Sequence, residues 1–92
     1  MTTMRERINN LELAEETICF AIARYSAAIH REQGKPNPDE AKIAHYEEEM
    51  RKMDDDLLGL RLDDDAGVQN AIEKYTLFLK KPRTALMGHN AA

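Results

Sequence analysis

Apolar residues recur along two segments of the chain at alternating intervals of three and four residues. In the first segment they are Met4, Ile8, Leu11, Ile18, Ile22, Tyr25 and Ile29. In the second segment they are Ile43, Tyr46, Met50, Met53, Leu57 and Leu60. Because about 3.6 residues complete one helical turn, this spacing keeps one side of each helix turned toward a partner. The pattern predicts two long helices that pack along a common seam.

Residues 34–38, with the sequence Gly-Lys-Pro-Asn-Pro, separate the two segments. Gly34 tolerates the left-handed conformation that is common just after a helix, and Pro36 prevents the helix from continuing. Asn37 is expected to cap the second helix, with Pro38 at its first position. The segment is therefore predicted to reverse the chain.

The first helix has a clear start, because Thr3 is followed three residues later by a glutamate, as in a capping box. We expect helices at about residues 3–33 and 38–62. If the chain turns near residue 36, the antiparallel pairing brings Tyr25 opposite Tyr46. The sequence thus predicts a hairpin that resembles an antiparallel coiled coil.

The first helix has a second apolar side, and a third helix is expected at about residues 66–81. A helix that is apolar on two sides must be covered on two sides. Either the C-terminal segment folds back to cover it, or a second molecule packs there. We expect a homodimer, whose interface contains Leu13, Phe20, Ala21, Ala28, Ile72, Tyr75, Phe78 and Leu79.

The composition agrees with one small helical domain. The chain has 92 residues, of which 5% are aromatic and none is Trp. Such a core favours helices over a sandwich or barrel. We therefore predict the all-α class: a helical hairpin and a shorter C-terminal helix, completed as a bundle by homodimerisation. The domain is expected to span residues 1–82, with residues 83–92 as a flexible tail.

The single Cys19 excludes a disulfide within the chain and is typical of a reducing compartment. The first residues lack a basic-then-apolar leader, and no apolar run approaches the roughly 20 residues that span a bilayer. We expect a cytoplasmic protein that does not enter a membrane.

One seam position of the first helix is charged, since Glu15 stands where an apolar residue is expected. Its carboxylate could pair with Arg61, which the hairpin brings close, because buried charges are normally paired. It could instead fix the register or the oligomeric state, as polar seam residues do. The third alternative is an inward carboxylate that serves a metal or moves a proton.

The sequence lacks the common patterns of catalysis and metal binding. Ferritin-like sites need Glu-x-x-His, but the residues three before the histidines are Ala27, Lys42 and Leu86. His45 with Glu48 and Glu49 forms at most a weak metal patch. There is no phosphate-binding loop, and the one serine lies in an alanine-rich helix. We expect no catalytic residue, no cofactor and no metal site, and therefore no enzyme.

Acidic residues are concentrated in the second half of the hairpin. Residues 39–65 contain eleven acids and four bases, a balance of −7, against a net charge of −4 for the whole chain. The acidic stripe, as we call it, consists of Glu47, Glu48, Glu49, Asp54, Asp55, Asp56, Asp63, Asp64 and Asp65. It either keeps the protein soluble or binds a basic surface of a partner.

These observations predict a small acidic regulatory protein that binds itself and a protein partner. One alternative is an acidic inhibitor that imitates nucleic acid and blocks a nucleic-acid-processing enzyme. A second alternative is a dimeric DNA-binding accessory protein whose dimer combines the basic termini, which include Lys80, Lys81 and Arg83. We do not expect direct binding of nucleic acid, because phosphate contacts require clustered Lys and Arg.

Overall fold

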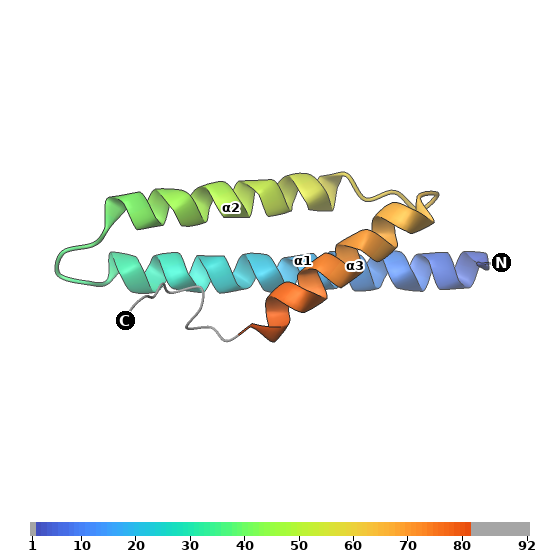
Figure 1. The fold of residues 1–92 in the computed structure, drawn as a ribbon, viewed down its shortest axis with the longest axis horizontal. Helices are drawn as coiled ribbons and strands as arrows, with labels where there is room; N and C mark the ends of the chain where they lie inside the picture. Colours follow the sequence, from blue (N-terminus) through green and yellow to red (C-terminus); the bar gives the residue numbers. More distant parts are fainter. Residues whose placement is uncertain (1, 82–92) are drawn as a thin grey trace.

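The protein is an elongated assembly of three helices (Figure 1). The computed structural model describes residues 2–81, so the expected tail at 83–92 lies outside the described residues. The helices are α1 (Met4–Gln33), α2 (Glu40–Leu58) and α3 (Asp65–Lys80), and residues 2–81 contain no strand. The molecule measures 54 × 22 × 15 Å. The predicted all-α class is confirmed. Within residues 2–81, no helix has both the length and the apolar content that a membrane span requires.

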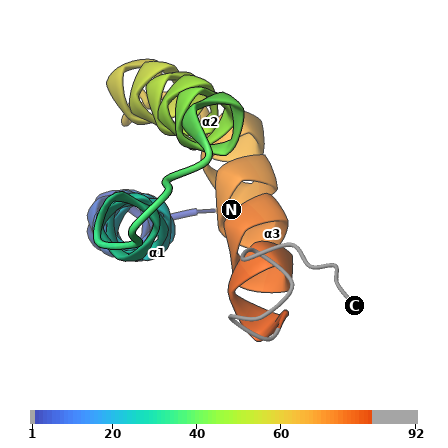
Figure 2. The same cartoon turned by 90° about the vertical axis from the view of Figure 1, so that its left-hand side faces the viewer.

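Helix α1 holds the other two helices. It packs against both α2 and α3, which lie on two neighbouring sides of it when the molecule is viewed along its long axis (Figure 2). Ala14, Ala21 and Ala28 follow one another at intervals of seven residues and have no exposed surface. Their small side chains allow close approach of helices. The structure shows α3 folded back onto α1, but Leu13 and Phe20 of the second apolar side stay exposed.

Tyr25 of α1 joins the three helices at the centre of the core. Its ring centroid lies 5.6 Å from that of Tyr46 in α2, its partner in the hairpin pairing. On its other side it stacks on Phe78 of α3, again at 5.6 Å. Such aromatic pairs stabilise by about 0.5–1.5 kcal/mol beyond the burial of their surface. Ile18 and Met53 continue this core along the hairpin.

The capping box at the start of α1 is confirmed. The Thr3 hydroxyl accepts a hydrogen bond from the Glu6 backbone N–H at 3.1 Å. The Glu6 carboxylate accepts one from the Thr3 backbone N–H at 2.8 Å. Two amide groups that the first helical turn leaves free are thereby satisfied.

The start predicted for α2 is wrong by two residues. Its cap is Asp39 rather than Asn37, and the Asp39 carboxylate accepts a hydrogen bond from the backbone N–H of Lys42 at 3.1 Å. Gly34 also departs from expectation, because its φ of −80° is not left-handed. The later start of α2 agrees with a contact of Glu32, whose carboxylate accepts a hydrogen bond from the Asp39 N–H at 2.9 Å and holds Asp39 at the start of the helix.

Glu32 is buried, with 5% of its surface exposed, although it carries a charge. Besides the Asp39 N–H, it accepts a hydrogen bond from the Lys35 ammonium at 2.9 Å, and the Lys42 ammonium lies 3.8 Å away. The hydrogen bond from Lys35, followed by that from Asp39, lowers the pKa of Glu32 below its ordinary value. A buried charge with two cations and a backbone donor therefore closes the connection between α1 and α2.

Helix α2 ends at Leu58, four residues before the expected position. Gly59 caps it, and α3 begins after Asp64, whose carboxylate accepts a hydrogen bond from the Gly67 backbone N–H at 3.0 Å. A Cβ at Gly67 would stand 2.3 Å from an Asp64 carboxylate oxygen, so a larger residue there would require this carboxylate to shift. Because α2 is short, the first turns of α1 extend beyond it.

The charge on Glu32 makes the hairpin sensitive to acid. In the unfolded chain the glutamate pKa is higher, so the unfolded state takes up the proton first as the pH falls, and the folded state loses stability. We expect the Tm of E32Q to lie a few degrees below wild type at pH 7, with a difference that shrinks below about pH 4. Thermal melts followed by circular dichroism test this. E47Q, at an exposed position, is the control, and an equal deficit of E32Q at both pH values would contradict the prediction.

The cap on α3 can be tested separately. D64A removes the acceptor for the Gly67 N–H, so we expect a loss of about 1 kcal/mol in the free energy of unfolding. D54A removes an exposed carboxylate of the same charge and should change it by less than about 0.5 kcal/mol. Urea unfolding of both variants measures the difference. Equal stability of the two variants would show that the cap contributes nothing.

Candidate functional site

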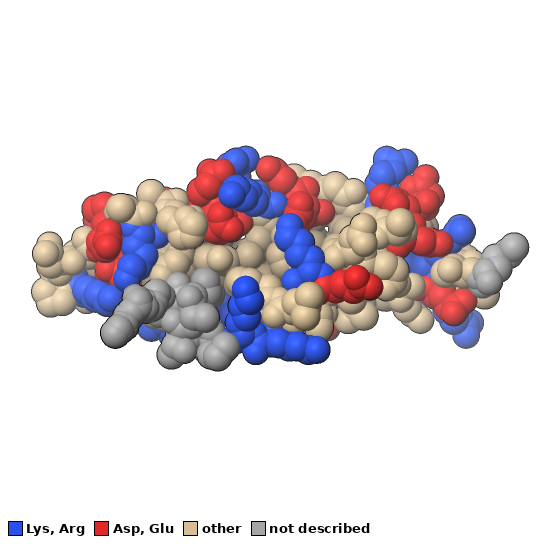
Figure 3. All heavy atoms as spheres, viewed as in Figure 1, with Lys and Arg blue, Asp and Glu red and all other residues tan. Residues whose placement is uncertain are grey.

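The acidic stripe is largely neutralised by neighbouring cations. Six of its nine residues form ion pairs at 2.5–3.4 Å. The pairs are Glu48 and Asp55 with Arg51, Glu49 with Lys52, Asp56 with Lys74, Asp63 with Arg61, and Asp65 with Arg7. On the face shown in Figure 3, basic and acidic side chains are interspersed. The stripe is thus a mixed surface rather than a continuous negative one.

The other three acids of the stripe have different surroundings. Asp64 caps α3, while Glu47 and Asp54 are exposed on α2. The nine carboxylates therefore do not converge on one point. Within residues 2–81, no group of three or more His, Cys, Asp and Glu side chains is arranged to hold a metal ion.

Asp56 is the member of the stripe with the most specific contacts. One of its carboxylate oxygens accepts hydrogen bonds from the Tyr75 hydroxyl at 2.5 Å and from the Lys74 ammonium at 3.0 Å, both on α3. Burial alone would raise the pKa of Asp56, but the hydrogen bonds from Tyr75 and Lys74 outweigh it and lower the pKa. Burial, followed by the hydrogen bond to Asp56, raises the pKa of Tyr75. The pair links α2 to α3, and we expect it to stabilise their packing.

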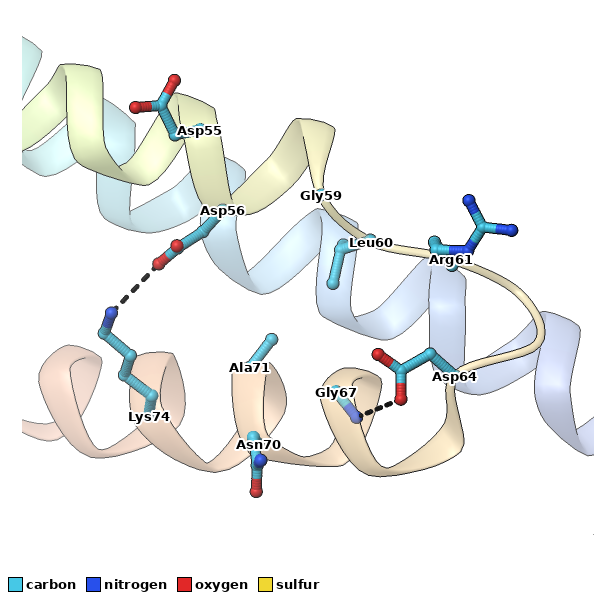
Figure 4. Close-up of a pocket in the computed structure, with 10 residues that line it drawn as sticks. All are labelled: Asp55, Asp56, Gly59, Leu60, Arg61, Asp64, Gly67, Asn70, Ala71 and Lys74. Carbon is cyan, nitrogen blue, oxygen red and sulfur yellow. Dashed lines mark hydrogen bonds and ion pairs between the residues drawn. The ribbon is translucent and has the colours of Figure 1, made fainter.

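A cleft of about 330 Å³ lies next to this pair, between the end of α2 and the start of α3 (Figure 4). Its charged side chains are already engaged, with Lys74 on Asp56, Asp64 on the Gly67 N–H, Arg61 on Asp63 and Asp55 on Arg51. No histidine, serine or cysteine of the described residues lines it. The cleft therefore offers neither a nucleophile nor a vacant charged group for a ligand.

An apolar surface lies at the end of the molecule where α1 extends beyond α2. The tip patch, as we call it, consists of Met4 and Ile8 on α1 and Leu62 in the connection to α3, which are 56%, 43% and 36% exposed. Met4 and Leu62 line one hollow of about 400 Å³. Leu58, at the end of α2, is 79% exposed. Clustered exposed apolar side chains of this kind mark interaction surfaces.

The residues predicted to form an oligomer interface divide into two groups. Ala21, Ala28 and Tyr75 are buried within the single chain, and Ile72, Phe78 and Leu79 are half-buried. Leu13 and Phe20 are 47% and 57% exposed. Their spacing of seven residues places them on one side of α1, and we call this surface the α1 flank.

Glu15 lies on the surface and not in a buried seam. Arg61, its possible partner, pairs instead with Asp63, its Nε lying 3.1 Å from an Asp63 carboxylate oxygen. His45 is exposed, and its ring lies 6.0 Å from that of Tyr46. Cys19 is exposed and has a free thiol.

Arg24 has a role that the sequence does not reveal. Its guanidinium donates hydrogen bonds to the backbone carbonyls of Leu79 and Lys81 at 2.7 and 2.8 Å. These carbonyls end α3 and lack helical partners, and a cation suits their negative dipole. The Arg24 contact has no spacing signal in the sequence, because it spans more than fifty residues.

Comparison of the chain with protein-family models, curated proteins and solved structures found no match. The surfaces described above therefore carry the functional argument.

The link between Asp56 and Tyr75 predicts an energetic coupling. Y75F removes the donor, and we expect a loss of about 1–2 kcal/mol in the free energy of unfolding, because the acceptor is charged. In a double-mutant cycle with D56A, the loss in the double variant should be smaller than the sum of the two single losses by at least about 0.5 kcal/mol. Urea unfolding measures each variant. Additive losses would show that the hydrogen bond does not stabilise the fold.

Proposed function

We propose that the protein is a small regulatory protein that acts without catalysis by binding a protein partner through its tip patch. The observation that carries this proposal is the exposure of Met4, Ile8 and Leu62 at one end of the molecule. Burial of one such side chain on binding contributes about 1.5–3 kcal/mol. The hollow between Met4 and Leu62 could receive an apolar side chain of the partner.

The acidic stripe contributes to this binding in a secondary way. Its paired carboxylates are screened by neighbouring cations, so they contribute little affinity when exposed. The net negative charge of the region instead attracts a partner with a basic surface and increases the association rate at low salt.

The proposal includes a homodimer in the cytoplasm. A second exposed apolar surface, the α1 flank, supports the dimer, and the free thiol of Cys19 agrees with a reducing compartment. The fold would then be a helical bundle completed by a second chain.

The nucleic-acid mimic receives less support from the geometry. A mimic needs a dense row of unneutralised negative charges, whereas six of the nine stripe carboxylates have a cation within 3.4 Å. No contact among residues 2–81 favours the DNA-binding alternative, and Arg83 of its basic cluster lies outside the described residues.

The tip patch can be tested with one matched pair of variants. We expect I8E to weaken binding to the partner by at least about tenfold, because a charge replaces an anchoring apolar side chain. L77E places the same charge at a 63% exposed leucine of α3 and should leave the affinity within about twofold.

The measurement has two stages. Immobilised wild-type protein captures the partner from native cytoplasm, and mass spectrometry identifies it. Calorimetry with the purified partner then compares the three proteins. Equal affinities of I8E and wild type would contradict the proposal.

A further inference from the structure

We propose that the α1 flank binds the same flank of a second copy, antiparallel, about a two-fold axis that passes through Phe20. This inference rests on the homodimer proposed above and specifies its surface and register. The α1 flank lies elsewhere on the molecule than the tip patch, and it binds a second copy of this chain rather than another protein.

The flank has two large exposed apolar side chains and lies next to the end of α3. Phe20 precedes Arg24 by four residues, so both lie on one side of α1, and Arg24 reaches the end of α3. Leu13 lies seven residues before Phe20 on the same side. With 57% and 47% of their surface in water, the two side chains are among the large apolar residues that the single chain leaves uncovered.

Leu13 and Phe20 lie away from the seam with α2. Ile18 and Tyr25, which are buried in the core with α2 residues, are about 160° and 140° from Phe20 around α1.

The charges around Phe20 are complementary to themselves under a two-fold axis. Glu16 lies four residues before Phe20 and Arg24 four residues after it. Eight residues of helix, about 12 Å, separate them and prevent a pair within one chain. Neither of the two forms an ion pair with any residue in the described range 2–81. An antiparallel pair of chains therefore contains two such contacts, each between Glu16 of one copy and Arg24 of the other.

Arg24 can serve both contacts. Two of its N–H groups bind the carbonyls at the end of α3, and a guanidinium has five such donors. Carbonyls do not neutralise its charge, so it remains able to attract a carboxylate.

The sizes of the side chains follow the same symmetry. Leu13 lies seven residues before Phe20 and the small Ala27 lies seven residues after it. The axis therefore brings each Leu13 against the Ala27 of the other copy, so that a large side chain meets a small one. It also brings the two Phe20 side chains together. The same surface on both chains is what a closed two-fold dimer requires.

Light scattering on a size-exclusion column tests the surface. We expect wild type and L77E to have twice the chain mass of 10.5 kDa. F20E should raise the dissociation constant of the dimer by at least about a hundredfold, and E16K, which sets an ammonium against Arg24, by about tenfold. Circular dichroism checks that each variant keeps its helices. A monomeric wild type, or a dimer that F20E leaves intact, would overturn the inference.

Cross-linking tests the register independently of stability. In a C19S background, L13C mixed with A27C should form a cross-linked heterodimer with a short bismaleimide, and neither variant should cross-link to itself. Self-linking of L13C would indicate a parallel dimer and overturn the proposed register. The tip patch is tested separately, by the binding of I8E to the protein partner. If F20E loses the dimer but still binds that partner, the two surfaces have different functions and the two proposals are independent.

Discussion

One constraint determines the rest of the structure. Helix α1 has apolar residues on two of its sides, and the chain is too short to cover the helix all round. Tyr25 shows how this is met, since it contacts an aromatic ring of α2 and an aromatic ring of α3. The other two helices therefore pack on α1, and the hydrogen bond between Asp56 and Tyr75 links them to each other. Because α2 and α3 lie on two neighbouring sides of α1 (Figure 2), its other sides face solvent. The exposure of the α1 flank is a direct result of this arrangement.

Much of the fold could be predicted from local spacing. The seam residues, the second apolar side of α1 and the Thr3 capping box are short-range patterns, and the three helices follow from them. The cap of α2 could not be predicted in this way. Asn37 is a good cap by residue type, but Glu32 binds the N–H of Asp39, and this contact requires the turn to be formed already. The early end of α2 also depends on the way in which the connection after Gly59 reaches α3.

The candidate surfaces were predictable only in part. The pairs of Arg51 with Glu48 and of Lys52 with Glu49 follow a helical spacing that the sequence contains. The pair of Lys74 with Asp56 could not be predicted in this way, because it requires α3 to be packed beside α2. Leu13 and Phe20 were found by helical period alone. The tip patch was not, since the exposure of Met4 and Ile8 arises from the difference in length between α1 and α2.

The cap on α3 places different demands on its two residues. A Cβ at position 67 would stand 2.3 Å from an Asp64 carboxylate oxygen, and this carboxylate can turn away to make room for it. Helix α2 has such an arrangement, since Asp39 caps it although Lys42 carries a side chain. Alanine at position 67 also removes the cost of about 1 kcal/mol that glycine has in a helix. Natural variants of this chain are therefore expected to keep the aspartate more often than the glycine, and the retained aspartate would identify the start of α3 in a distant relative whose apolar pattern has changed.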